Sequence, residues 1–170
     1  MTRRQLRESI FQVLFRVEFN TEEEWKEQLN LYMDELDHPA MPKIVNLSDQ
    51  EEESDAKEPE RQVSQIFDEA NMNVAEVTDL DLAYIRQKAE QIYDKLPIID
   101  EKIAEHTEGW TISRIGKAEL AILRLAVYEL LFDEDVPQKV AINEAVELSK
   151  IYCPDDAKGF VNAVLAKFTK

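Results

Sequence analysis

The sequence predicts an all-α fold, a compact single-domain helical bundle of about seven to eight helices. Only three glycines occur, and no run of alternating β-branched residues bounded by turn signals appears, so strands have little support. The six prolines stand where helices can begin or end. A chain of 170 residues with 44% hydrophobic content can bury about 70% of its unfolded surface, which suits one core.

Apolar residues spaced at i, i+3 and i+4 mark the helices along the chain. The predicted ranges are about 3–19, 22–36, 62–70, 79–96, 98–106, 116–132, 138–152 and 156–168. Asp79 precedes an apolar-periodic run, so we expect it to cap the helix at 79–96. Asp155 and Asp156 open the last helix, where negative charge suits the helix dipole and one of the two is expected to act as a cap.

The range 116–132 is predicted to be the central helix of the bundle. Its sequence, GKAELAILRLAVYELLF, has too many apolar residues to fit on one stripe. A helix that is apolar nearly all round is a buried helix. It is too short, and too interrupted by Arg124 and Glu129, to cross a bilayer.

The net charge of −16 is unevenly distributed along the chain. Residues 1–17 are basic, with Arg3, Arg4, Arg7 and Arg16 against the single Glu8. Residues 109–170 are nearly balanced, so most of the negative charge lies between 18 and 108. Within that region, residues 46–60 (NLSDQEEESDAKEPE) are acidic and poor in apolar side chains, and we expect a flexible, solvated insert there.

Four segments resemble the NusB family of bacterial transcription antitermination proteins. They are RRQLRESIFQVLF near the start and WTISRIGKAELAILRLAVYEL, VPQKVAINEAVELSK and FVNAVL in the second half. The resemblance implies one NusB-like helical domain over 1–170 and a cytoplasmic RNA-binding factor. It also implies pairing with the ribosomal protein NusE, binding of boxA RNA from rRNA operon leaders, and a place in an RNA polymerase antitermination complex with other Nus factors.

The basic first helix is the first candidate RNA surface. Arg3, Arg4 and Arg7 lie near one helix end, where guanidinium groups can reach successive phosphates, and the resemblance places them on the family's arginine-rich RNA-binding segment. Phe15 follows on the same helix and can stack on a base, although core packing is the alternative. The acidic stretch at 46–60 has a second interpretation, as a phosphate mimic that screens this surface or attracts a basic partner.

The start of the last helix is the second candidate surface. It carries Tyr152, Asp156, Lys158 and Phe160, and the resemblance places this turn beside the first helix, where it completes the RNA surface. An aspartate there can accept hydrogen bonds from base amino groups, whereas it repels phosphate. The resemblance also places Glu119, on the central helix, at the acidic position that meets the basic ribosomal protein.

Other classes of function have weaker support. The three scattered glycines cannot form a phosphate-binding loop, the lone Cys153 has no suitable neighbours for nucleophilic catalysis, and no cofactor or metal is expected. Glu35 and His38 form one E-x-x-H pattern, but a di-metal carboxylate enzyme needs a second copy. The alternatives are that enzyme and a helical adaptor of the same fold without RNA binding. No signal peptide or membrane span is expected, and a monomer and a homodimer both stay open.

Overall fold

A computed structural model of the chain describes residues 1–39 and 76–169. Within these two ranges the protein has seven α-helices, one short 3-10 helix and no strand, which confirms the predicted fold class. The helix predicted at 62–70 and the acidic stretch at 46–60 lie outside the described residues.

Every helix predicted within the described ranges is present, with ends that differ by at most three residues. The helices are α1 (Arg3–Val17), α2 (Trp25–Asp37), α4 (Asp79–Asp94), α5 (Leu96–His106), η1 (Ile112–Arg114), α6 (Lys117–Phe132), α7 (Gln138–Tyr152) and α8 (Ala157–Ala166). No helix in the described residues is both long and apolar enough to span a membrane.

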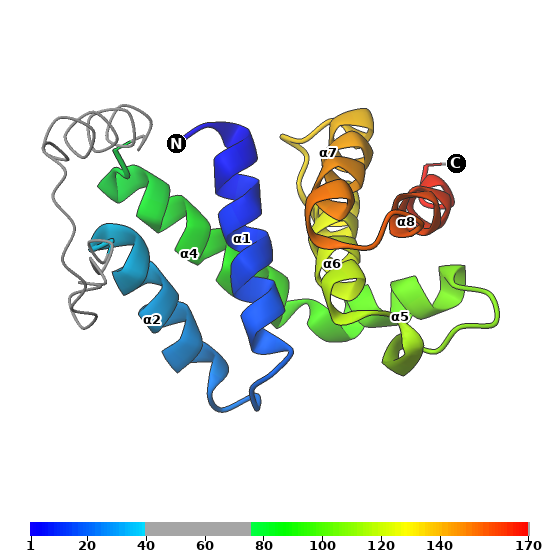
Figure 1. The fold of residues 1–170 in the computed structure, drawn as a ribbon, viewed down its shortest axis with the longest axis horizontal. Coiled ribbons are helices and arrows are strands. Elements are labelled where there is room, and N and C mark those ends of the chain that lie inside the picture. Colours follow the sequence, from blue (N-terminus) through cyan, green and yellow to red (C-terminus); the bar gives the residue numbers. More distant parts are fainter. Residues whose placement is uncertain (40–75, 170) are drawn as a thin grey trace, which may run out of the picture.

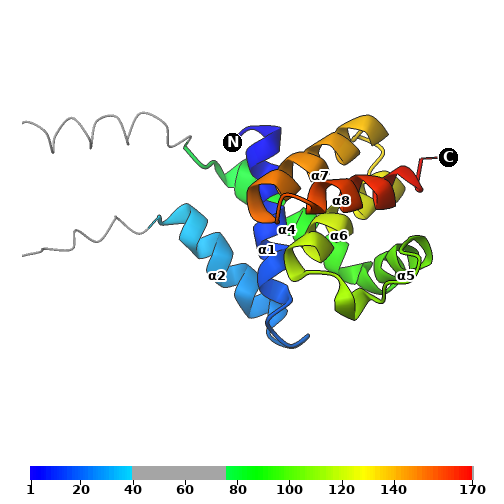
Figure 2. The same cartoon turned by 45° about the vertical axis from the view of Figure 1, so that its right-hand side comes forward.

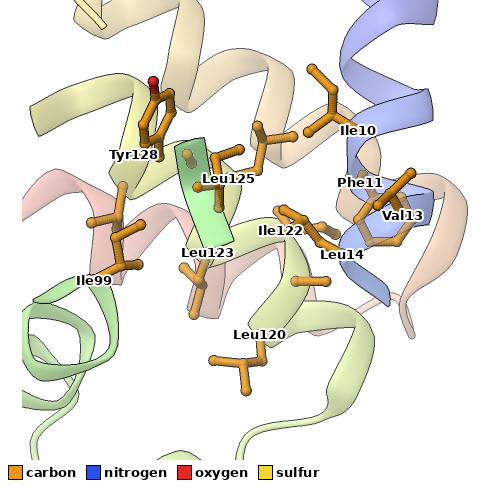
Figure 3. Close-up of a cluster of buried hydrophobic side chains, with 14 of the residues drawn as sticks. Ile10, Phe11, Val13, Leu14, Ile99, Leu120, Ile122, Leu123, Leu125 and Tyr128 are labelled. Atoms are coloured by element: carbon orange, nitrogen blue, oxygen red, sulfur yellow. The ribbon is translucent and has the colours of Figure 1, made fainter. Parts of the chain in front are cut away.

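Helix α6 forms the centre of the bundle, as its apolar sequence predicts. It packs against α1, α5, α7 and α8, and Ala121, Ile122, Leu123 and Val127 are completely buried. In the core, Ile122 lies beside Phe11 and Leu14 of α1 (Figure 3). Burial of each such large side chain stabilises the fold by roughly 1.5–3 kcal/mol, so α6 organises the helices that carry the candidate site.

Helix α1 separates two parts of the molecule. Helices α2 and α4 pack on one side of α1, and α6 packs on the other (Figure 1). The Trp25 ring of α2 stacks on Tyr93 of α4 with centroids 3.9 Å apart. Beyond α6, helices α7 and α8 lie side by side (Figure 2). This arrangement brings the first helix of the chain and the last two helices around α6.

The cap of α4 differs from the prediction. Thr78, and not Asp79, is the N-cap residue: its hydroxyl accepts a hydrogen bond from the Asp81 backbone N–H, and the Asp81 carboxylate accepts one from the Thr78 N–H at 3.0 Å. This reciprocal pair is a capping box. Asp79 is the first helical residue, where its charge suits the helix dipole. The Met1 ammonium also lies 3.0 Å from Asp81, which ties the start of α1 to α4.

Arg124, one of the two charged interruptions of α6, joins three elements. Its guanidinium donates two hydrogen bonds of 2.8 Å to the Asp100 carboxylate of α5. It also pairs with Glu18, directly after α1. A charge on a central helix is therefore tolerated because two carboxylates from neighbouring elements surround it.

Candidate nucleic-acid interface

The arginines at the start of α1 have different environments. The helix begins with a capping box in which Thr2 and Gln5 exchange hydrogen bonds. Gln5, which lies between the arginines in the sequence, therefore caps the start of the helix. Arg3 is exposed and forms no ion pair with any described residue. The Arg4 side chain is 64% exposed but binds the Glu144 carboxylate through two hydrogen bonds, of 2.8 and 3.0 Å. Arg3 is thus the cation most available to phosphate.

Arg7 does not face solvent as the sequence interpretation expected. It is 9% exposed, and its Nε donates to Glu129 Oε1 of α6 at 2.8 Å. Arg7 was expected from the sequence to reach phosphate; the structure places its guanidinium in a buried ion pair between α1 and α6, and an RNA contact by Arg7 stays a prediction. The reason is tertiary: Glu129 is 122 residues away in the sequence, and its position could not be read from the spacing of the arginines.

A cavity of about 580 Å³ lies beneath these arginines, between α1, α4, α6 and α7. Most of its charges are paired, because Lys88 lies 2.7 Å from Asp133 and the Arg4 and Arg7 pairs also line it. One buried carboxylate oxygen, Oε2 of Glu129, has no hydrogen-bond partner among the described residues. Burial raises the pKa of Glu129 to about 7, although the Arg7 guanidinium acts in the opposite direction.

An aromatic row runs along α1 from Tyr152 toward the start of α6. The Tyr152 ring lies 4.6 Å from Phe11, Phe11 lies 6.1 Å from Phe15, and Phe15 lies 5.1 Å from Phe19. Phe11 is buried and Phe15 half-buried, whereas Phe19 is 60% exposed, with the Lys117 ammonium 4.3 Å above its ring. Phe19 and Lys117 were not among the residues predicted from the sequence. The i, i+4 spacing of Phe15 and Phe19 was the available signal.

Tyr152 links α7 to α1 through hydrogen bonds as well as packing. Its hydroxyl donates to Glu8 and accepts from the Gln12 amide at 3.0 Å. The Gln12 carbonyl oxygen in turn accepts from the Tyr32 hydroxyl of α2 at 2.9 Å. The predicted contact between this turn and the first helix is therefore made by Tyr152, which is held in one orientation by its partners.

A second cavity, of about 280 Å³, lies at the start of α6. It brings together three predicted site residues, Glu119, Asp156 and Phe160, with Trp110 and Arg114 from the segment around η1. Lys158 is exposed and does not line the cavity. Trp110 and Arg114 were not among the residues predicted from the sequence, and no motif or spacing in the sequence indicated them.

The two carboxylates of this cavity are placed by helix starts. Asp156 is the N-cap residue of α8, but its side chain accepts no capping hydrogen bond, so the expected side-chain cap is not formed. Glu119 lies in the first turn of α6, and its carboxylate folds back over Gly116. A Cβ at Gly116 would lie 2.8 Å from the Glu119 Cδ, closer than atoms tolerate. The absent side chain of Gly116 therefore leaves room for the Glu119 carboxylate.

Cys153 directly follows α7 and has no feature of a nucleophile. Burial, aided by the negative charge of Glu119, raises the pKa of the Cys153 thiol to about 11. The thiolate is the reactive form, so this environment disfavours reactivity. Among the described residues, no three His, Cys, Asp or Glu side chains gather in a group that could hold a metal ion.

Comparison with known proteins identifies the family of this chain. The model of the NusB family matches residues 42–170. The transcription antitermination protein NusB of Agathobacter rectalis is 39% identical over 99% of both chains, and that of Lachnoclostridium phytofermentans is 36% identical over 98% of both. The solved structure of T. maritima NusB superposes with a TM-score of 0.63 at 26% identity, covering 99% of this chain and 90% of that one. The chain belongs to the NusB family.

Proposed function

We propose that this protein is a cytoplasmic RNA-binding transcription antitermination factor that binds boxA-type single-stranded RNA of rRNA operon leaders. In this proposal it pairs with the ribosomal protein NusE and acts in an RNA polymerase antitermination complex with other Nus factors. Family membership supports the general role. One structural observation supports RNA binding in particular, namely a surface on which cations, aromatic rings and hydrogen-bond acceptors follow one another.

The order of these groups suits a single strand. Arg3 and Arg4 lie at the start of α1, Tyr152 meets the middle of α1, and the cavity with Phe160 lies at the start of α6. Glu119 lies at the start of α6, ten residues before Glu129, which is the partner of Arg7. Ten residues of α-helix span about 15 Å, so the cavity and the Arg7 pair are separated by about this distance along α6. Single-stranded RNA is bound by such grooves, in which cations meet phosphates and aromatic side chains stack on bases.

A basic partner is part of the proposal for an electrostatic reason. The chain has a net charge of −16, and the carboxylates of Glu144 and Glu129 neutralise Arg4 and Arg7. The free protein should therefore bind RNA weakly and with strong dependence on salt. A cationic protein docked near Glu119 offsets the negative field and extends the surface along the RNA.

The pairing of Arg4 and Arg7 also favours the second candidate, a helical adaptor of the same fold without RNA affinity. A binding titration separates the two. BoxA-type RNA is titrated with the protein at two salt concentrations, with and without purified NusE. Under the proposal, binding is measurable at low salt, weakens as salt rises, and strengthens with NusE. An adaptor would bind NusE and leave the RNA free under all four conditions.

A further inference from the structure

We propose that the cavity at the start of α6 binds a single nucleobase, that Trp110 is its stacking surface, and that the Asp156 carboxylate selects guanine. This inference rests on the proposed function, since it assigns one base of the same RNA. The cavity of about 280 Å³ falls just below the range of about 300–1,000 Å³ typical of whole small-molecule sites. A single base is an occupant of suitable size.

The geometry of the two aromatic rings indicates how the base lies. The Trp110 and Phe160 centroids are 6.4 Å apart, and the ring planes are inclined by 55°. A flat base cannot stack on both rings at once at that angle. Trp110 is 54% exposed whereas Phe160 is half-buried, so the indole offers the open face, and Phe160 forms the wall of the cavity. Every base can stack on an aromatic ring, so Trp110 contributes to affinity but does not distinguish one base from another.

The carboxylates determine which base is bound. Asp156 forms no ion pair or hydrogen bond with any described residue, and the Glu119 carboxylate adds a second negative charge to the lining of the cavity. Ionised carboxylates only accept hydrogen bonds, and they repel phosphate. The bound group must therefore be a neutral donor. Among the described residues, Arg114 is the one cation that lines this cavity, and it can hold the adjoining phosphate at the rim.

Guanine matches this requirement better than the other bases. Its Watson–Crick edge places two donors, N1–H and the N2 amino group, side by side, so one carboxylate can accept both. On cytosine and adenine the amino group adjoins a ring-nitrogen acceptor, and on uracil N3–H lies between two carbonyls. Those acceptors would face the second oxygen of Asp156 and repel it. Bidentate recognition of this kind discriminates by a factor of about 5 to 150.

Short uridine oligomers with one central guanosine, inosine or adenosine test the proposal. Inosine keeps N1–H and lacks only the N2 amino group. Affinities are measured by fluorescence anisotropy, and tryptophan emission is followed in the same titration. We expect the guanosine oligomer to bind at least fivefold more tightly than the inosine oligomer, and to quench emission that is absent from Trp110→Phe. Trp25 is buried against Tyr93, so its emission serves as an internal reference.

Two variants sharpen the test. Asp156→Asn replaces one acceptor oxygen by a donor and should make the guanosine and inosine affinities equal. Asp155→Asn is the matched control, because Asp155 is adjacent and exposed but does not line the cavity, and it should keep the preference. Equal affinities in the unsubstituted protein, or a preference that survives Asp156→Asn, would overturn the assignment of guanine while leaving RNA binding intact. If no oligomer and no boxA-type RNA binds, the proposed function itself fails.

Discussion

The Nε of Arg7 and the Oε1 of Glu129 lie 2.8 Å apart inside the bundle, so the arginine-rich start of α1 contributes to the core as well as to the surface. Removing one partner of a buried ion pair leaves the other charge uncompensated. We therefore expect Arg7→Ala to lower the free energy of unfolding by about 3–5 kcal/mol. Urea denaturation at pH 8, where Glu129 is mostly ionised, measures the change.

Arg4→Ala is the matched control for this prediction. Arg4 also pairs with a carboxylate, but its side chain is 64% exposed, and exposed pairs contribute about 0–1 kcal/mol. Because Arg7→Ala is expected to destabilise the fold, its RNA affinity is compared only under conditions in which the variant is folded. If Arg7→Ala and Arg4→Ala unfold at the same urea concentration, the Arg7–Glu129 pair does not stabilise the core.

Glu129 also makes stability depend on pH. Burial raises its pKa to about 7 from an ordinary value of 4.5, so between these values the folded protein holds a proton that the unfolded chain has released. The stability contributed by this group is fully present below about pH 4.5 and is lost as pH rises through about 7. The slope is at most about 1.4 kcal/mol per pH unit.

The variant Glu129→Gln isolates this contribution, because a glutamine does not titrate. Urea midpoints measured from pH 5 to pH 8 should fall less steeply for Glu129→Gln than for the unsubstituted protein, whatever the absolute stability of the variant. Glu147→Gln, which removes an exposed carboxylate of α7, should leave the steeper slope unchanged. Parallel pH profiles for Glu129→Gln and the unsubstituted protein would contradict the raised pKa.

The helices could be predicted from the sequence because their signals are local. The apolar run of α6 and the i, i+3, i+4 spacing of α7 and α8 need no knowledge of the rest of the fold. The cap of α4 was placed one residue late because Thr78 and Asp79 are both good caps, and the capping box with Asp81 decides between them.

The site was harder to predict because it depends on partners distant in the sequence. Glu119, Asp156 and Phe160 were identified by resemblance, and the fold brings them to one cavity. That Arg7 is buried follows from Glu129, on another helix. Trp110 and Arg114 lie in and just before the short 3-10 helix η1, which does not have the i, i+3, i+4 spacing that marks the α-helices. Nothing in the sequence therefore indicated that they share a cavity with α8.

Arg3 should make the main electrostatic contact with RNA phosphate, because Arg4 and Arg7 are paired with carboxylates. Arg3→Ala is expected to weaken binding of boxA-type RNA and to reduce the slope of log K against log salt by about 0.7, the value for one phosphate contact on a single strand. Arg86→Ala is the control, because this arginine binds Asn30 of α2 at 2.8 Å. Identical salt slopes for Arg3→Ala and Arg86→Ala would remove Arg3 from the RNA surface.

The position of Glu119 predicts how the protein responds to NusE. We expect NusE to tighten RNA binding at least tenfold, which corresponds to about 1.4 kcal/mol. Glu119→Lys should remove most of that gain, because it repels a basic partner. Glu119 also lines the proposed base cavity, so the gain of each variant is expressed relative to the RNA affinity of that variant without NusE. Gly116→Ala is a gentler probe. It keeps the charge but displaces the Glu119 carboxylate, whose Cδ would lie 2.8 Å from the new Cβ.

Because only the end of a flexible side chain must move, Gly116→Ala should fold normally and lose part of the NusE effect. The measurement is RNA affinity with and without saturating NusE for the unsubstituted protein, Gly116→Ala and Glu119→Lys. The expected order of the NusE gain is largest for the unsubstituted protein, intermediate for Gly116→Ala and smallest for Glu119→Lys. If the free protein already binds at full strength, or if Glu119→Lys keeps the whole gain, the basic partner does not act through this carboxylate.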